Sequence, residues 1–252
     1  MRSRRWQDAP YPKFYLKKKQ FRHTNPSFSA VPTAFTHDYT QFHLTPIFFD
    51  TEFSGLHQQT YLLSLAFVPL EGPWFYAVFT DADLEPLRKS KFHRENTLPH
   101  LDLTPSQQQA LPVGTYVRGS REKVVAALTE YLATFAAPDP KKKTLAVWAD
   151  VPAYDWILLC ELFGGALELP KHIHYVVRDL ATLLEAKGYH IDTDRFALAY
   201  NEDSADVEAN VNSADGRVGE SQIPAATQEG LLRHNALGDA LACRACWQKI
   251  IA

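Results

Sequence analysis

Residues 47–80 read IFFDTEFSGLHQQTYLLSLAFVPLEGPWFYAVFT, in which apolar segments are separated by polar and turn-forming residues. The first segment, IFFDTEF (47–53), is short and rich in aromatic residues, which predicts a β-strand. TYLLSLAFVPL (60–70) and WFYAVFT (74–80) predict two more strands, and the Gly-Pro pair between them is typical of a turn. The stretch therefore predicts a three-stranded antiparallel meander.

Helix and strand signals alternate after this meander. Residues 81–119 are interpreted as an irregular insertion with short helical pieces. Further on, KTLAVWA (143–149) predicts a buried fourth strand, and helical spacing of apolar residues predicts helices over 120–137, 154–163, 178–187 and 235–250. A meander followed by this alternation predicts an α/β fold with a mixed central sheet and helices on both faces. The order of elements resembles that of a ribonuclease-H-like fold.

The composition fits one sizeable domain preceded by an extension. Of the 252 residues, 46% are hydrophobic and 22% are charged, an ordinary globular balance. Residues 1–45 show no sustained helical or strand period and are predicted to be a basic, aromatic-containing N-terminal extension of the domain at 46–252. Residues 201–228 are small and polar, which predicts a mobile loop.

The net charge of −3 is unevenly distributed, since residues 1–46 carry eight Lys or Arg against two Asp. A basic arm on an acidic body is one way to hold a polyanion near a carboxylate-rich site. From the charge alone, a solvated and disordered tail is at least as good an explanation of the basic N-terminus as a nucleic-acid-binding arm.

The cellular location of the protein is predicted from its cysteine count and from its lack of a signal-peptide core and of long apolar segments. Its three cysteines are too few for a disulfide framework and fit a reducing compartment. No apolar run approaches the roughly 20 residues that a membrane-spanning helix needs. The basic N-terminus lacks the apolar core of a secretory signal. We therefore expect a cytoplasmic protein with no membrane association.

Asp50 and Glu52 are the first candidates for chemistry. Residues i and i+2 of a strand point to the same face, so the two carboxylates lie side by side. Like charges that are partly desolvated repel each other, and a divalent cation removes that repulsion. Taken alone, the spacing is common, and a strand end facing solvent is the better interpretation.

Asp150 and Asp155 follow the strand at 143–149, at the edge where α/β sheets bind their ligands. Asp155 falls in the first turn of the next helix, where a carboxylate also complements the helix dipole. Asp150 is interpreted as a helix N-cap that accepts backbone N–H bonds. Neither residue by itself indicates a site.

His234 and Asp239 lie near the start of the last helix. Five residues correspond to about 140° of rotation around a helix, so the two side chains would not share a face if both were helical. They converge only if His234 precedes the helix and Asp239 projects from its first turns. A lone histidine in this position is more often a cap or a surface residue.

The combination is more specific than its parts. The segments FFDTEFSG, WADVPAYDW and HNALGDA, in this chain order, resemble the three motifs of the DEDDh 3′–5′ exonucleases, over roughly residues 47–250. SKFHRENTLPHL (90–101) resembles an insertion of the bacterial exoribonuclease-like branch of that family. Many members read His-Asn-x-x-Phe-Asp in the second motif, where this chain reads DVPAYD (150–155), so the His-Asn pair is absent.

The resemblance implies hydrolysis of phosphodiester bonds from the 3′ end of a nucleic acid, with RNA favoured. It implies two Mg²⁺ ions, which Mn²⁺ replaces, on hard carboxylate oxygens. The implied metal ligands are Asp50, Glu52, Asp155 and Asp239. His234 is the implied general base, because its ordinary pKa near 6.5 suits proton transfer near neutral pH.

The expected partners are the 3′ ends of RNA or single-stranded DNA, and the resemblance also implies a homodimer. Residues next to the motifs are the expected walls of the pocket for the 3′-terminal nucleotide: Thr51, Phe53, Tyr154, Trp156 and Asn235. Aromatic rings stack on any base, although core packing is the better interpretation of Phe53.

Two alternatives stay open at this point. One is a DNA proofreading or repair exonuclease with the same chemistry. The other is a catalytically silent nuclease fold that only binds nucleic acid. The five filled catalytic positions argue against the silent fold, which has no reason to keep a complete metal site.

Overall fold

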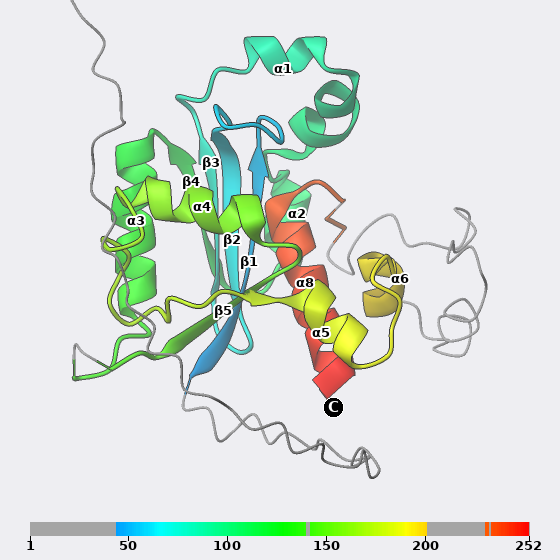
Figure 1. Cartoon of the computed structure of the whole chain (residues 1–252). Helices are drawn as coiled ribbons and strands as arrows, with labels where there is room; N and C mark the ends of the chain where they lie inside the picture. Colours follow the sequence, from blue (N-terminus) through cyan, green and yellow to red (C-terminus); the bar gives the residue numbers. More distant parts are fainter. Residues whose placement is uncertain (1–43, 140–141, 201–229, 232, 252) are drawn as a thin grey trace, which may run out of the picture. The chain divides into compact units, whose positions relative to one another are not determined.

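The computed structural model describes residues 44–139, 142–200, 230–231 and 233–251, which build a layered α/β domain (Figure 1). Its centre is a six-stranded sheet with the strand order β4-β3-β2-β1-β5-β6. The predicted extension, as far as residue 43, and the predicted loop at 201–228 lie outside the described residues.

β1 (Thr45–Phe53), β2 (Leu62–Pro69) and β3 (Trp74–Phe79) form the antiparallel meander that the sequence predicts. Every residue of β2 and β3 is buried, because helices cover both faces of the sheet. That burial explains why these segments are continuously apolar. The turn between them passes through Gly72, whose φ of 109° lies in the left-handed region that favours glycine.

β4 (Gly114–Gly119) corrects the interpretation of residues 81–119 as irregular. It pairs in parallel with β3 at the edge of the sheet. Its sequence, GTYVRG, carries little apolar pattern because much of this edge strand is exposed. The rest of the segment forms short helical pieces, as predicted: α1 (Glu85–Lys89), the π-helical turn η2 (His93–Thr97), the 3-10 turn η3 (Leu98–His100) and α2 (Pro105–Ala110).

β5 (Leu145–Ala149) is the predicted buried strand and pairs in parallel with β1, but only as far as Phe48. The two-residue strand β6 (Arg178–Asp179) completes the sheet where the sequence predicted the start of a helix. Because β5 ends early, the carboxyl end of β1 has an open edge on that side. The candidate catalytic residues gather around this open edge.

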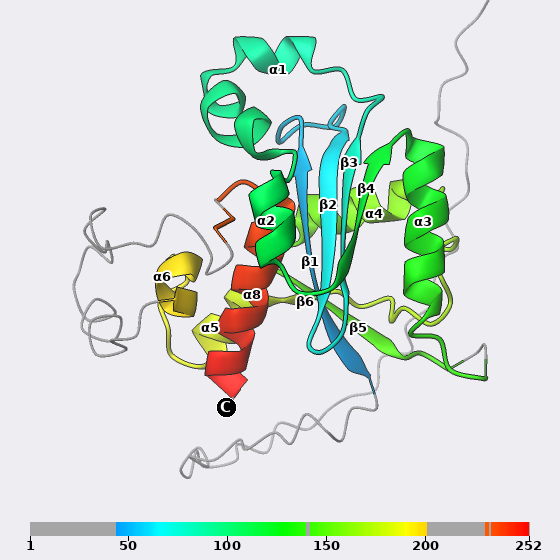
Figure 2. The same cartoon turned by 180° about the vertical axis from the view of Figure 1, so that it is seen from behind.

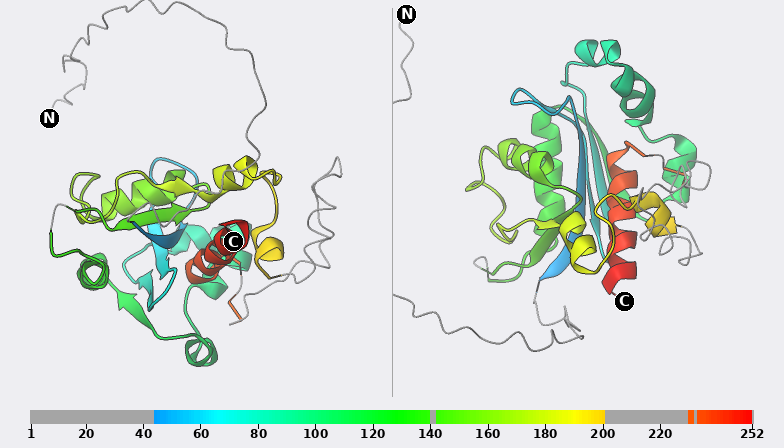
Figure 3. Two further views of the ribbon diagram at one scale, coloured as in Figure 1. Left: turned by 90° about the horizontal axis from the view of Figure 1, so that it is seen from below. Right: turned by 45° about the vertical axis from the view of Figure 1, so that its right-hand side comes forward.

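Helices cover both faces of the sheet (Figures 2 and 3). α8 (Ala236–Ile251) packs across β1 and β2 on one face, and α3 (Arg121–Ala133) and α4 (Ala153–Leu162) lie on the other. α5 (Leu180–Ala186) follows β6, and α6 (Arg195–Tyr200), which was not predicted, packs against α8. The mixed sheet with helices on both faces confirms the predicted ribonuclease-H-like class.

Aromatic side chains fill both layers of the core. On the α8 face, the Phe48 and Trp247 rings meet edge to face, with their centroids 5.6 Å apart. On the opposite face, Phe49 stacks on Phe67 at 4.6 Å. β1 is therefore anchored on both sides just before Asp50. None of the described helices is long and apolar enough to cross a membrane.

Gly114→Ala is expected to destabilise the protein by about 1–3 kcal/mol, because overpacking a filled site forces its neighbours to move. A Cβ at position 114 would overlap the buried indole of Trp74, which is held by its Nε1–H donating to Pro112 O at 2.9 Å. Urea denaturation measures the change. Gly119→Ala is the matched control, since the three atoms nearest its Cβ all belong to the flexible side chain of Lys123. Equal stability of the two variants would contradict this account.

Candidate active site

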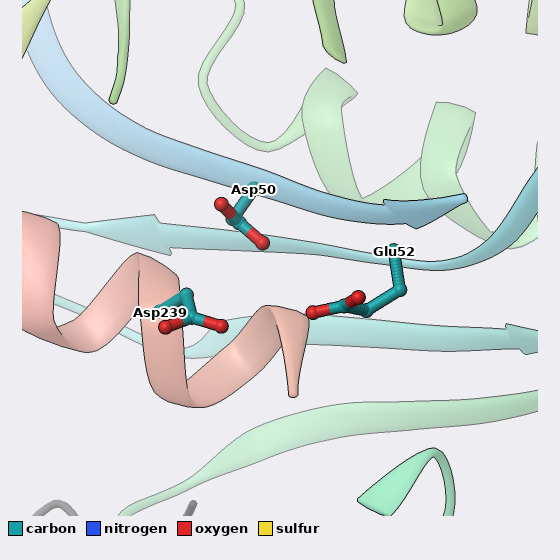
Figure 4. Close-up of side chains that lie close together, drawn as sticks. All are labelled: Asp50, Glu52 and Asp239. Atoms are coloured by element: carbon teal, nitrogen blue, oxygen red, sulfur yellow. The ribbon is translucent and has the colours of Figure 1, made fainter. Parts of the chain in front are cut away.

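Three carboxylates meet where β1 and α8 cross. Asp50 and Glu52 point toward α8 from alternate positions of β1, and Asp239 faces them from the first turn of α8 (Figure 4). Ligand oxygens of the three side chains lie within 4.8 Å of one another. The structure thus joins the D-x-E pair of the first strand to an aspartate that lies far along the chain.

The electrostatics of this cluster are unfavourable without a counter-charge. Burial, followed by the negative charge of Asp239, holds the pKa of both Asp50 and Glu52 well above the usual range. Burial also raises the pKa of Asp239 to about 7, although its hydrogen bond from the His234 backbone opposes the rise. Such crowding is typical of carboxylates that share a cation.

The donor set fits a hard divalent cation. All three side chains offer carboxylate oxygen, the ligand that Mg²⁺ and Mn²⁺ prefer, and none of them offers sulfur or imidazole nitrogen.

Asp155 sits beside the cluster at the open edge of β1. Its side chain comes from the first turn of α4 and is only 7% exposed. Its Oδ1 accepts two hydrogen bonds from Thr51, one from the backbone N–H at 3.1 Å and one from Oγ1 at 2.5 Å. Asp155 therefore takes the place of the missing strand partner of Thr51, and its charge raises the pKa of both Asp50 and Glu52.

Asp150 does not act as the N-cap that the sequence suggested. Both of its oxygens accept from the guanidinium of Arg195, from Nε at 3.0 Å and from Nη2 at 2.9 Å. The N-cap position of α4 is Pro152, and Asp179 Oδ1 accepts the Val151 N–H at 3.0 Å. The Arg195 pair thus neutralises a further acid close to the site.

The turn before α8 brings His234 and Asp239 together. His234 precedes the helix with a φ of 60°, in the left-handed region, and its backbone N–H donates to Asp239 Oδ2 at 2.9 Å. Asn235 Oδ1 accepts from the N–H groups of Leu237 and Gly238 and so caps the helix. Asp239 is therefore fixed by the same turn that places His234.

The imidazole of His234 is half-buried against the ring of Phe92, edge to face, with their centroids 5.0 Å apart. Burial lowers the pKa of His234, and the nearby charges of Arg233 and His100 lower it further. The ring is therefore neutral at physiological pH, which is the state that accepts a proton. Arg233 is itself held by Asp194 through bonds of 2.7 and 2.5 Å.

Three residues of the segment over 85–101 also surround the site and were not predicted from the sequence. Phe92 covers His234, His93 Nε2 lies 3.2 Å from the Phe53 carbonyl oxygen, and the hydroxyl of Thr97 lowers the pKa of Glu52. All three belong to the stretch SKFHRENTLPHL, whose resemblance to a family insertion assigns no role to single residues. That stretch was the signal available, but it gave no hint of which side chains turn inward.

The expected substrate contacts divide into two groups. Asn235 and Thr51 are buried, at 2% and 5% exposure, and their polar side-chain groups bond within the protein, so a contact with substrate stays a prediction for both. Asn235 Nδ2 donates to His100 O and to the Tyr76 hydroxyl, whereas Thr51 donates to Asp155. The second group is partly exposed: Phe53 and Tyr154 stack at 5.6 Å, and Trp156 packs on the core.

Comparison with known proteins shows that the chain is similar to members of one family. Residues 45–251 match the model of the 3'-5' exoribonuclease Rv2179c-like domain. The chain is 30% identical over 141 residues to the 3'-5' exoribonuclease Rv2179c of Mycobacterium tuberculosis strain H37Rv, covering 56% of this chain and 74% of the relative. The 3'-5' exoribonuclease MT2234.1 of strain CDC 1551 matches equally well.

Asp239→Asn is expected to stabilise the metal-free protein at pH 8 by on the order of 2 kcal/mol. The pKa of Asp239 is raised in the fold from 3.8 to about 7, so folded stability is lost as the pH rises through that window. A neutral amide avoids this loss and keeps an oxygen for the His234 N–H. Thermal unfolding in EDTA should show a larger gain for the variant at pH 8 than at pH 5.

The same variant should lose its response to cations. Mg²⁺ in excess should raise the Tm of the wild type, by linkage of binding to folding, and hardly change that of Asp239→Asn. Asp192→Asn, at a side chain that is 83% exposed, is the control and should behave as wild type. A lower Tm for Asp239→Asn in EDTA at pH 8 would count against electrostatic crowding.

Proposed function

This chain belongs to the Rv2179c-like family of 3'-5' exoribonuclease domains, and from that premise we propose that it shortens RNA from the 3′ end at the site around Asp50. It is a 3′–5′ exonuclease with a ribonuclease-H-like fold. The observation that carries the site assignment is the convergence of Asp50, Glu52 and Asp239 within 4.8 Å, from β1 and α8. Divalent metal use fits both the family and this acidic group.

In the proposal, two Mg²⁺ ions are held by Asp50, Glu52, Asp155 and Asp239. Bound cations would supply charge neutralisation at the phosphate and a more acidic water nucleophile. Asp50 lies centrally, because its pKa responds to the charges of the other three acids. Asp155 keeps Oδ1 on Thr51, so we assign its Oδ2 to the cation.

His234 acts as the general base in this proposal. The ring is neutral at pH 7 because burial lowers its pKa, so it accepts the proton of the attacking water. The left-handed turn at His234 and the Asp239 hydrogen bond fix the backbone from which the ring projects. Attack breaks the bond between phosphorus and the 3′ oxygen of the preceding nucleotide, and a 5′-monophosphate leaves.

We also propose Phe53, Tyr154 and Trp156 as contacts of the 3′-terminal nucleotide, since all three are partly exposed and adjoin Glu52 or Asp155 in the sequence. Their rings would accept any base, which suits an enzyme that shortens RNA of varied sequence.

We further propose a cytoplasmic homodimer. Three free, buried cysteines fit a reducing compartment, and the dimer rests on the family resemblance. Light scattering at micromolar concentration measures the oligomeric state, and a monomer would remove the dimer from the proposal without affecting the chemistry.

The first experiment is digestion of 5′-labelled RNA and DNA oligonucleotides of one sequence, with Mg²⁺, Mn²⁺ or EDTA. We expect a ladder that shortens from the 3′ end, faster on RNA and absent in EDTA. His234→Ala should slow it by roughly 10²–10⁴-fold, the usual contribution of a general base. Asp155→Asn should also lose activity, because the amide is a poor cation ligand.

His190→Ala is the matched control, since this histidine is exposed and its Nδ1 accepts the backbone N–H of Asp192, a residue outside the proposed site. Its activity should equal that of the wild type. Faster digestion of DNA than of RNA would favour a repair or proofreading role. The absence of metal-dependent shortening on either polymer would overturn the proposal and leave a binding module.

The pH profile tests the base. Since the pKa of His234 lies below its ordinary value of 6.5, the single-turnover rate with saturating RNA and Mg²⁺ should persist below pH 6.5 before it falls. Phe92→Ala exposes the ring, so the pKa should rise and the acid limb should move to higher pH. An acid limb that does not move in Phe92→Ala would mean that another group controls it.

A further inference from the structure

Positive charge is concentrated in one short segment of an otherwise acidic domain. Residues 1–46 take eight of the 26 Lys or Arg but only two of the 29 Asp or Glu, so the rest of the chain carries 18 basic and 27 acidic residues. Four of these 18 fall within RKSKFHR (88–94), which contains no acid. An acidic body repels a polyanion, so the place of this basic segment bears on how RNA is held.

The basic segment lies at the catalytic end of the sheet. Figures 1 and 2 show α1, with the turn that follows it, beyond the carboxyl end of β1. Within the segment, the ring of Phe92 meets that of His234 edge to face, with the centroids 5.0 Å apart. The basic residues on either side of Phe92 therefore adjoin the proposed general base.

Buried contacts hold the segment in this place. His93 is buried, with its Nε2 3.2 Å from the Phe53 carbonyl oxygen and its Nδ1 3.1 Å from Ser90 Oγ. Arg94 Nη1 donates to the carbonyl oxygen of Arg88 at 3.4 Å. The π-helical turn η2 that begins at His93 is a rare conformation, found mostly at functional sites. The segment is thus attached to the end of β1 by its inward-facing residues.

The other basic side chains of the segment are free to bind an anion. Lys89 is exposed and makes no ion pair within the described part of the chain. Lys91 is 82% exposed and lies 4.0 Å from Glu95, and the exposed Arg88 pairs with Glu85 at 2.7 Å. Ion pairs between exposed side chains are weak, so phosphate can replace either acid.

We propose that Arg88, Lys89 and Lys91 form a binding surface for the phosphates of the RNA strand on the 5′ side of the scissile bond. A 3′–5′ exonuclease holds the terminal nucleotide at its carboxylates, so the rest of the strand leaves the site in the 5′ direction. Lys and Arg neutralise phosphates without reading the bases, which suits RNA of varied sequence. The inference rests on the proposed function in placing the 3′ end at the carboxylate cluster.

The test begins with binding. Lys89→Gln/Lys91→Gln removes two of these charges at exposed positions, and fluorescence anisotropy of a labelled RNA oligonucleotide in EDTA measures affinity without cleavage. We expect binding to weaken roughly tenfold. The slope of log affinity against log salt should become shallower by about 1.4, since each phosphate contact on a single strand contributes about 0.7. Lys89→Arg/Lys91→Arg keeps both charges and should bind as the wild type does.

Lys142→Gln/Lys171→Gln is the matched control, since it removes the same charge from exposed positions at the opposite end of the sheet. Lys142 shortly precedes β5, and Lys171 shortly precedes Ile173, which bridges Leu145 at the start of β5. Because β5 is parallel to β1, its start lies away from the carboxyl end of β1. This variant should bind RNA as the wild type does. Equal losses in the two double variants would reflect net charge alone and would overturn the inference.

Substrate length locates the surface along the strand. The one internucleotide phosphate of a dinucleotide lies at the carboxylates, so its KM should not change in Lys89→Gln/Lys91→Gln. With a long oligonucleotide the KM should rise roughly tenfold at an unchanged kcat. An equal rise with both substrates would overturn the assignment to the 5′ side. Failure of the exonuclease proposal is distinguishable, because the wild type would then leave RNA intact while binding in EDTA still decides whether this surface holds it.

Discussion

Repulsion among Asp50, Glu52 and Asp239 is the force that the fold must oppose. Three acids within 4.8 Å, partly shielded from water, would separate or take up protons if their backbones were free to move. They are held by the packing of α8 across β1 and β2, secured by the contact between Phe48 and Trp247. Stability is thus given up at the site and recovered in the aromatic core beneath it, as is common where strain serves function.

Ion pairs outside the cluster brace the parts that have no sheet support. Asp194 and Arg195 are adjacent at the start of α6, and their side chains form ion pairs with two different segments. Asp194 holds Arg233 in the turn before α8, and Arg195 holds Asp150 after β5. Both pairs are partly buried, so losing one partner would leave a charge uncompensated near the site. α6 therefore ties together two segments that carry His234 and Asp155.

The open edge of β1 explains why the second motif tolerates a departure from the family pattern. Asp155 takes the hydrogen bond that a longer β5 would have made to Thr51, so its position is set by backbone geometry. The residues before it in the motif bond elsewhere in the protein: Asp150 accepts from Arg195, and the Val151 N–H donates to Asp179. The loss of the His-Asn pair leaves the carboxylate in place because the carboxylate depends on Thr51.

The local sequence pattern was enough to predict the meander, the buried strand β5 and the start of α8. Buried strands require runs of apolar residues, and buried helix faces require apolar residues at helical spacing. The pattern was also enough to predict that Asp50 and Glu52 share a face, since strand alternation is a local property. β4 and α6 were not predicted, because an exposed edge strand and a short helix carry little of that pattern.

Tertiary structure alone decided which partners meet. The side chains of Asn235 and Thr51, which are predicted to contact substrate, also bond within the protein, because the hydrogen-bond needs of a helix start and of a strand edge must be met. Asp150 met Arg195, 45 residues away, and His93 met the Phe53 carbonyl oxygen, 40 residues away. The sequence by itself determined the residue types and their order along the chain, which specify the fold and the metal chemistry. Only the folded chain decided which side chains hold those acids in place, because the contacts join segments whose separation along the chain carries no local signal.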